Sequence, residues 1–194
     1  MADPLSVLHN YLFQAVWVGW AAYWAFSSAS ASAPKRVQSP YARLLHRMEL
    51  LFAFALLAIP ALRVGWLGRK IVPWSESLFV VGAVLLVLGI GFAIWARVHL
   101  GQNWSGHVTL KAGHRLIRSG PYAIVRHPIY TGILLAIIGT AVALDDWAGV
   151  IAILIVAETF VRKLRIEERW LTEEFGDEYR AYRREVKALI PGVA

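Results

Sequence analysis

The sequence predicts an all-α, polytopic membrane protein with about five transmembrane helices. Its 194 residues are 58% hydrophobic, with a mean hydropathy of +0.52, which is too apolar for an ordinary soluble domain of this size. The first apolar segment is long and follows Asp3 rather than a basic region, so we interpret it as a retained span and not as a cleaved signal. The chain has no cysteine, which excludes disulfides and thiolate metal sites.

Five apolar segments account for the expected spans. They cover Leu8–Phe26, Leu44–Leu62, Ser77–His99, Pro128–Leu144 and Trp147–Val161. The third is long enough to cross a hydrocarbon core of roughly 30 Å as a helix of about 20 residues, and its Gly82, Gly89 and Gly91 permit close helix contacts. The fourth and fifth are shorter and nearly contiguous, so we expect a tight antiparallel hairpin whose ends continue as helix beyond the membrane.

The basic residues indicate how the spans are oriented. Seventeen of the 20 fall in the loop after the first span and its flanks, around the loop after the third, or in the tail after the fifth. Because cytoplasmic segments accumulate Lys and Arg, the N-terminus is expected outside and the C-terminus in the cytoplasm. The membrane is then that of a prokaryotic cell or the endoplasmic reticulum. The net charge of +7 follows from this topology and does not indicate nucleic-acid binding. An oligomeric state is not specified.

Two cytosolic pieces remain after the spans are assigned. The loop Gly101–Arg126 is expected to be irregular, with several turns. The tail has apolar residues at helical spacing, is interrupted at Gly176 and closes at Pro191, which predicts two amphipathic helices joined at Gly176. We therefore divide the chain into residues 1–100, with the first three spans, and residues 101–194, where a site is expected.

The segment RHPIYTG, residues 126–132, places polar groups at the start of an apolar helix. Proline suits the first turn of a helix, so Pro128 leaves the N-terminal amides of the fourth span free. Free amides flanked by Arg126 and His127 favour an anion, such as a carboxylate or a phosphate. The alternative is that these residues are interfacial anchors, which are common where helices leave a bilayer.

Acidic residues form a second candidate cluster. Glu158 lies within the fifth apolar segment, where an ionisable group is costly and is a functional or helix-pairing candidate. Glu167 follows Lys163 by four residues, so the two either form an i, i+4 pair or offer a carboxylate to a cation held beside the RHP segment. The six histidines fit no metal-binding spacing, and no metal site is predicted.

Two longer motifs resemble a known family. The stretch HRLIRSGPYAIVRHPIYTG, followed by IEERWLTEEFGDEYRAYRREVKALIP, is similar to the isoprenylcysteine carboxyl methyltransferases, within the membrane methyltransferases that include phospholipid methyltransferases. The similarity covers about 80 residues of the C-terminal part. It implies an enzyme that uses S-adenosylmethionine, bound between the cytosolic loop, the fourth span and the tail helices, with a lipid-like substrate entering from the bilayer.

The resemblance also implies roles for individual residues. Glu167 or Glu168 would meet the cationic amino end of the cofactor, and Arg126 or His127 its carboxylate. A basic residue before the glutamates would address the substrate carboxylate, where Arg162, Lys163 and Arg165 compete and Lys163 is the best positional match. The catalytic set is then Arg126, Glu167 and Lys163. The remaining cofactor-binding residues are His114, Leu116, Ile117, Tyr122, His127, Pro128, Tyr130 and Glu168.

The chemistry separates this function from its alternatives. Methyl transfer from a sulfonium to a carboxylate needs no strong base, because the carboxylate is already ionised at neutral pH, and requires mainly alignment of the reacting atoms. A phospholipid N-methyltransferase would need a base such as Glu158, Glu168 or a histidine to deprotonate an ammonium. An NADPH-dependent membrane reductase and a non-catalytic transporter or scaffold are the other classes considered.

Overall fold

Helices are the only regular secondary structure among the described residues, which also contain one isolated bridge between Lys70 and Asp146. The computed structural model describes residues 4–28, 38–73, 75–101 and 116–193, without the side chains of residues 4–10. Its elements are α1 (Pro4–Ser28), α2 (Pro40–Ala58), the 3-10 turn η1 (Pro60–Leu62), α3 (Glu76–Leu100), α4 (Pro121–Ile124), α5 (Pro128–Leu144), α6 (Trp147–Phe175) and α7 (Asp177–Glu185).

Local sequence signals explain where these helices begin and end. Ser39, Ser75 and Asp146 each accept a hydrogen bond from a first-turn amide of the following helix, as N-cap residues do. Asp145, with a left-handed φ of 51°, caps the C-terminus of α5, and Gly176, with a φ of 54°, caps that of α6. The predicted hairpin is confirmed, because α5 ends at Leu144 and α6 begins at Trp147.

The predicted second span and the tail differ in detail from the expectation. Helix α2 ends at Ala58 instead of Leu62, because Ile59 precedes Pro60 and adopts an extended conformation. The first of the two expected tail helices is the uninterrupted continuation of α6 to Phe175. Among the described residues, α3 alone is both long and apolar enough to cross a membrane, and α5, with 17 residues, is apolar but shorter.

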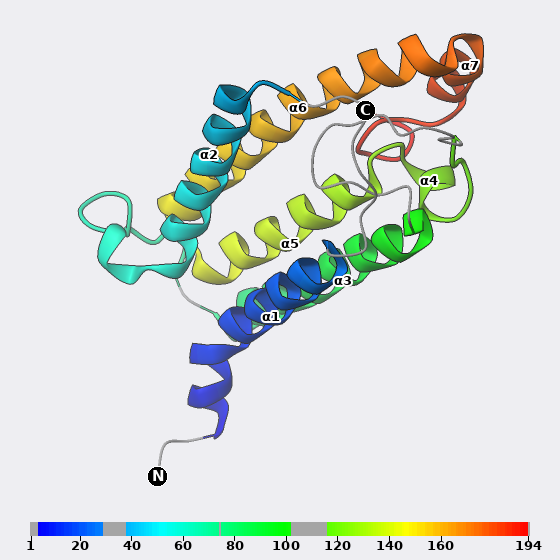
Figure 1. Cartoon of the computed structure of the whole chain (residues 1–194). Coiled ribbons are helices and arrows are strands. Elements are labelled where there is room, and N and C mark those ends of the chain that lie inside the picture. Colours follow the sequence, from blue (N-terminus) through cyan, green and yellow to red (C-terminus); the bar gives the residue numbers. More distant parts are fainter. Residues whose placement is uncertain (1–3, 29–37, 74, 102–115, 194) are drawn as a thin grey trace.

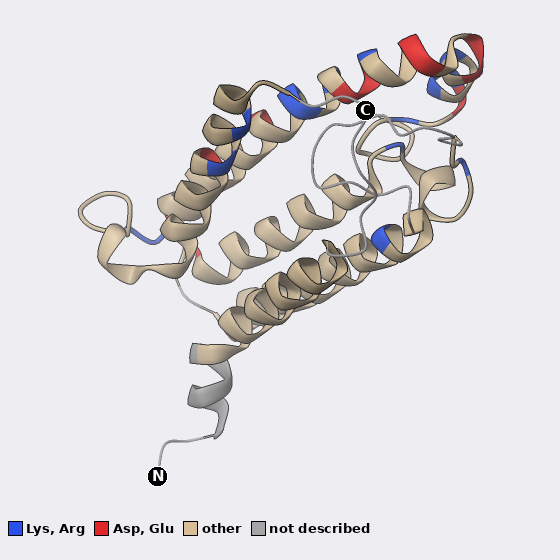
Figure 2. Cartoon of the chain, viewed as in Figure 1, with Lys and Arg blue, Asp and Glu red and all other residues tan. Residues whose placement is uncertain are grey.

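Helices α3, α5, α6 and α2 pack side by side in that order, with α1 against α3 (Figure 1). The main core lies where α2, α5 and α6 meet and includes Leu57, Ile133, Ile137, Val156 and Phe160. Charged residues gather on the distal half of α6 and on α7, whereas α5 carries none (Figure 2). The charged half of α6 and α7 therefore lie at the end of the helix bundle where α5 begins.

Glycines bring α3 and α5 into backbone contact. A Cβ added to Gly82 would lie 2.4 Å from the carbonyl oxygen of Gly139, and one added to Gly89 would lie 2.5 Å from that of Gly132. The two contacts show that the helices run antiparallel. Gly91 has no atom within 4 Å of such a Cβ. Two of the three predicted glycines therefore mediate close helix packing, and Gly91 does not.

This contrast gives a matched test of the packing. Gly89→Ala is expected to lower the melting temperature in detergent by roughly 5 °C, because the new methyl group meets backbone atoms that cannot move aside. Gly91→Ala, two residues along the same helix, is expected to keep or raise it, since alanine favours helix. Equal melting temperatures for the two variants would contradict the close contact.

Candidate functional site

The carboxylates of Glu167 and Glu168 lie just beyond the N-terminus of α5. Helices α5 and α6 form an antiparallel hairpin, so Pro128 lies opposite about residue 163 of α6. Helix α6 continues past that point, which carries the two glutamates over the RHP segment. The hairpin geometry thus joins the two clusters that the sequence analysis treated separately.

Glu168 is a buried carboxylate surrounded by cations. Arg126 donates to its Oε1 through Nε at 2.8 Å and Nη2 at 2.5 Å, and Nε2 of His127 lies 3.3 Å from the same oxygen. Nε of Arg183, from α7, lies 3.4 Å from Oε2. Burial alone would raise the pKa of Glu168, but the hydrogen bonds from His127 and Arg126 outweigh it and lower the pKa to about 2.

His127 lies between the two carboxylates. Its Nδ1 is 3.5 Å from Oε2 of Glu167, and the Tyr130 hydroxyl donates to Oε1 of Glu167 at 2.5 Å. Burial would lower the pKa of His127, but its hydrogen bonds to Glu167 and Glu168 raise it above the ordinary value. Burial would raise the pKa of Glu167, but the bond to His127 and the charge of Lys163 lower it. The contacts within the cluster thus favour the protonated form of His127 and the ionised forms of the two carboxyl groups.

Lys163 is the one cation of this cluster that lacks an anionic partner among the described residues. Its Nζ lies 5.3 Å from the centre of the Tyr130 ring, a cation–π distance. The i, i+4 ion pair expected with Glu167 is not formed, because Glu167 instead meets Tyr130 and His127. Burial lowers the pKa of Lys163, and the charge of Glu167 only partly opposes this. Among the described residues, the Lys163 amine thus lies in the site without a carboxylate bound to it.

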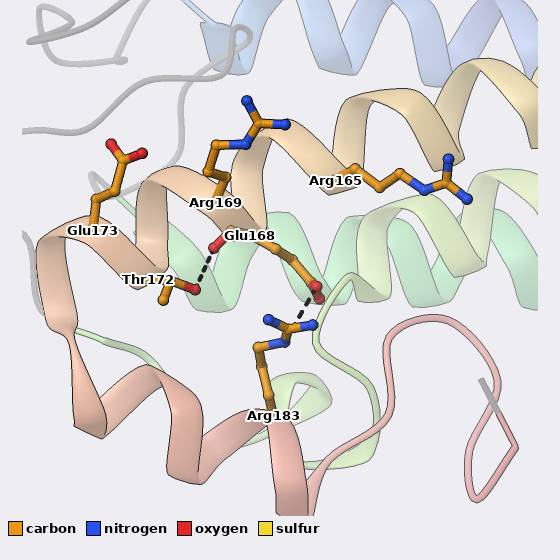
Figure 3. A pocket seen from close by; sticks show the side chains of 6 residues that line it. All are labelled: Arg165, Glu168, Arg169, Thr172, Glu173 and Arg183. Atoms are coloured by element: carbon orange, nitrogen blue, oxygen red, sulfur yellow. Dashed lines mark hydrogen bonds and ion pairs between the residues drawn. The ribbon is translucent and has the colours of Figure 1, made fainter.

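The other two basic candidates lie elsewhere. Arg162 is bound to Glu49 of α2 and pairs with Glu158 at 2.6 Å. Arg165 is exposed and lines a pocket on the side of Glu168 that faces Arg183 (Figure 3). Glu158, with 60% of its side chain exposed, therefore forms an ion pair with Arg162 on the same helix. Arg162 also binds Glu49, and this second contact links α2 to α6. Of the three competing residues, Lys163 is the one that contacts the cluster.

The guanidinium of Arg126 donates hydrogen bonds to groups of the protein itself. Besides Glu168, it donates through Nη1 to the carbonyl oxygens of Arg183 and Val186 at the C-terminal end of α7. A cation is favourable at that end of a helix. The groups that the sequence analysis interpreted as an anion site, Arg126 and His127, thus hold one of the protein's own carboxylates, Glu168.

The segment after α7 is a part of the site that the sequence analysis missed. The amides of Arg126 and His127 donate to the carbonyl oxygens of Lys187 and Ala188 at 2.8 and 3.0 Å. These bonds join the start of the RHP segment to the tail after α7. The only sequence signal was the run KALIP, whose apolar residues after a charged helix favour docking against the protein.

The other residues expected to bind the cofactor differ in burial, and one of them lies outside the described residues. Tyr122 is buried in α4, and its carbonyl oxygen accepts from the Tyr182 hydroxyl at 2.5 Å. Burial, and then the charge of Glu167, raise the pKa of Tyr122 well above its ordinary value. Leu116 and Ile117 are half-buried ahead of α4, and His114 lies outside the described residues.

Comparison with known proteins identifies relatives of this chain. A family model described as phospholipid methyltransferase matches residues 77–178, just over half of the chain. A protein-S-isoprenylcysteine O-methyltransferase of Schizosaccharomyces pombe is 35% identical over 109 residues, which cover 55% of this chain and 46% of the relative. The Saccharomyces cerevisiae protein of that name is 34% identical over 115 residues, covering 58% and 48%.

A solved structure is also similar. It is that of a eukaryotic intramembrane Ras methyltransferase, isoprenylcysteine carboxyl methyltransferase, with a TM-score of 0.57 and 26% identity. The match covers 79% of this chain and 52% of that one. The chain therefore spans about half the length of these relatives, and its helical fold resembles that of this intramembrane methyltransferase.

Proposed function

The chain belongs to the phospholipid methyltransferase family, and we propose that it transfers a methyl group from S-adenosylmethionine to the carboxylate of an isoprenylated cysteine or a related lipid-like acceptor. The observation that carries this proposal is the pairing of opposite charges above α5. Glu167 offers a carboxylate with 21% of its side chain exposed. Lys163 offers an ammonium without an anionic partner among the described residues. A cationic donor and an anionic acceptor would each find a counter-charge there.

The residues of the site have distinct proposed roles. Glu167 meets the cationic amino end of the cofactor, which supplies the activated methyl group when bound. Lys163 orients the acceptor carboxylate without transferring a proton. Arg126 acts as a positioning residue, because its donors already hold Glu168 and the end of α7. The other cofactor contacts would come from His114, Leu116, Ile117, Tyr122, His127, Pro128, Tyr130 and Glu168.

The electrostatics favour a carboxylate acceptor over an amine. Transfer to a carboxylate breaks the sulfur–methyl bond, forms an ester bond and leaves S-adenosylhomocysteine, with no proton to remove. Transfer to a phospholipid ammonium would require a base. Glu167 and Glu168 are poor bases, because the surrounding cations lower the pKa of each carboxyl group.

The topology is part of the proposal. We place residues 1–100 as the lipid-substrate side and residues 101–194 as the catalytic region, in a five-span protein of a prokaryotic cell membrane or the endoplasmic reticulum. The N-terminus lies outside, and the site lies at the cytoplasmic surface. The bond between Glu49 of α2 and Arg162 of α6 supports direct contact between the two parts.

The function is tested with the purified protein and S-adenosylmethionine labelled in its methyl group. Farnesylcysteine and phosphatidylethanolamine are offered as separate acceptors. The expected product is a base-labile methyl ester on farnesylcysteine. A base-stable N-methyl label on phosphatidylethanolamine would instead establish the second candidate, to which the description of the matching family model points.

Glu167→Gln is expected to weaken S-adenosylhomocysteine binding by about tenfold in calorimetry, because a charge-assisted contact to the ligand's amino group is lost. Glu185→Gln is the matched control, since Glu185 pairs with Arg118 on the exposed surface. If the Glu167→Gln variant bound S-adenosylhomocysteine with unchanged affinity, the Glu167 carboxylate would not belong to the cofactor site. Binding of NADPH in a parallel titration would favour the reductase class.

A further inference from the structure

His46 of α2 faces the junction where α2, α5 and α6 meet. At about 100° per residue, it points within about 20° of both Ala53 and Leu57, which are buried in the core shared by these three helices. His46 is half-buried, whereas its neighbours Leu45 and Arg47 are exposed. The imidazole therefore lies on the inward face of α2, two turns before Ala53.

The contacts between α2 and α6 place His46 level with Lys163. The two helices lie side by side and run in opposite directions (Figure 1). Glu49 accepts hydrogen bonds from the Thr159 hydroxyl at 3.1 Å and from Arg162, so it lies level with about residue 160 of α6. His46 comes three residues before Glu49 and therefore lies level with about residue 163. The charge of Lys163 acts on the His46 ring, as this register requires.

Lys163 lies on the face of α6 that borders the same junction. Around the helix axis it is about 40° from Thr159, which bonds to α2, and about 60° from Phe160, whose ring contacts Tyr130 of α5. Its Nζ lies over that Tyr130 ring, 5.3 Å from the centre. Lys163 and His46 thus lie at one level, on the faces of α6 and α2 that meet at the junction.

The carboxylates beside this junction already have partners, whereas Lys163 and His46 do not. Glu49 is bound by two side chains of α6, and Glu167 is bound by two side chains of residues 126–132. Within the described residues, Lys163 has no anionic partner and the ring nitrogens of His46 form no hydrogen bond. A carboxylate has two oxygens, so it can accept from an ammonium and from an imidazole N–H at once.

We propose that His46 is a second residue that binds the acceptor carboxylate, donating a ring N–H to one oxygen while Lys163 binds the other. This inference rests on the proposed methyl transfer and extends it to α2, which precedes the residues 77–178 that the family model matches. It gives the lipid-substrate side of the chain a direct part in acceptor recognition. Both contacts weaken once the carboxylate becomes an ester, because hydrogen bonds to an uncharged acceptor are weaker.

The test compares the binding of an acid with that of its ester and does not depend on turnover. Farnesylcysteine and farnesylcysteine methyl ester are titrated separately into the full chain saturated with S-adenosylhomocysteine, and the ratio of the two dissociation constants is measured. The variants are His46→Phe, which keeps a ring without nitrogen, and His46→Gln, whose amide can still donate. Arg47→Gln is the matched control, because Arg47 is exposed on the same turn of α2.

Wild-type protein is expected to prefer the acid, and His46→Phe is expected to lower this preference by about tenfold, because a hydrogen bond to a charged group is lost. His46→Gln should retain more of the preference than His46→Phe, and Arg47→Gln should retain it within about twofold. The affinity of His46→Phe for the ester should also stay within about twofold of wild type. The affinity for S-adenosylhomocysteine, measured first for each variant, verifies folding.

The outcomes separate this inference from the proposed function. If His46→Phe kept the full preference for the acid, His46 would not bind the carboxylate, although the proposed function would stand. Equal weakening of acid and ester in His46→Phe would make the ring a structural part of the junction and would also overturn the role. If wild-type protein bound acid and ester equally, the carboxylate acceptor itself would be wrong, and the role of His46 with it.

Discussion

Arg126→Ala is expected to abolish methyl transfer and to lower the melting temperature by roughly 10 °C. The side chain binds Glu168 through two nitrogens and donates to the carbonyl oxygens of Arg183 and Val186. Its removal leaves a buried carboxylate with less compensation, which costs about 3–5 kcal/mol. A protein of this size loses about 2–4 °C per kcal/mol. Helix α7 would also lose the cation at its C-terminal end.

Arg118→Ala provides the matched control for Arg126. Arg118 precedes Arg126 by eight residues, and its ion pair with Glu185 is partly exposed, so its removal is expected to cost less than about 1 kcal/mol. Adding Glu168→Gln to Arg126→Ala should restore part of the melting temperature, because the second change removes the unpaired charge. If the Arg126→Ala and Arg118→Ala variants had the same melting temperature, Arg126 would not have the positioning role assigned to it.

Lys163→Gln is expected to reduce kcat/KM for the acceptor by roughly tenfold to a hundredfold, with the affinity for S-adenosylhomocysteine unchanged. A hydrogen bond to a charged group contributes about 1.5–3 kcal/mol, which corresponds to that range. Lys163 is free for such a bond, since its Nζ meets the Tyr130 ring and no carboxylate among the described residues. A fall in cofactor affinity with an unchanged acceptor KM would assign Lys163 to the cofactor instead.

The pH dependence of acceptor binding tests the same residue. Burial lowers the pKa of Lys163 in the free protein, and only the ammonium form attracts a carboxylate. As the pH rises through this lowered pKa, the ammonium is lost, so the acceptor KM should increase on the alkaline side. Lys163→Arg should move this increase to higher pH, because guanidinium stays protonated. An identical alkaline limb in that variant would exclude Lys163 as the titrating group.

Much of the helical architecture could be predicted because its signals are local. The α5–α6 hairpin follows from two apolar runs separated by Asp145 and Asp146, and the break at Gly176 follows from the residue itself. The end of α2 could also have been predicted, since Pro60 forces the preceding residue out of the helix. Each of these signals acts within about one turn of the chain.

The site was only partly predictable. The residues Arg126, His127, Glu167 and Glu168 were selected from the sequence, but their mutual contacts were not. The spacing of Lys163 and Glu167 suggested a pair, whereas Glu167 meets Tyr130 from another helix. The contribution of the tail after α7 had no clear local signal.

The sequence by itself determined which segments are apolar helices, where they end and which polar groups stand at one end of them. Only the tertiary structure decided which polar groups meet, because the partners lie 40 to 60 residues apart in the chain, as in the ion pair between Arg126 and Glu168 and the hydrogen bond from Arg126 to the carbonyl oxygen of Val186. Helix propensity and capping depend on neighbours in the chain. The pairing of buried charges depends instead on distances through space, which the α5–α6 hairpin and the docking of α7 establish.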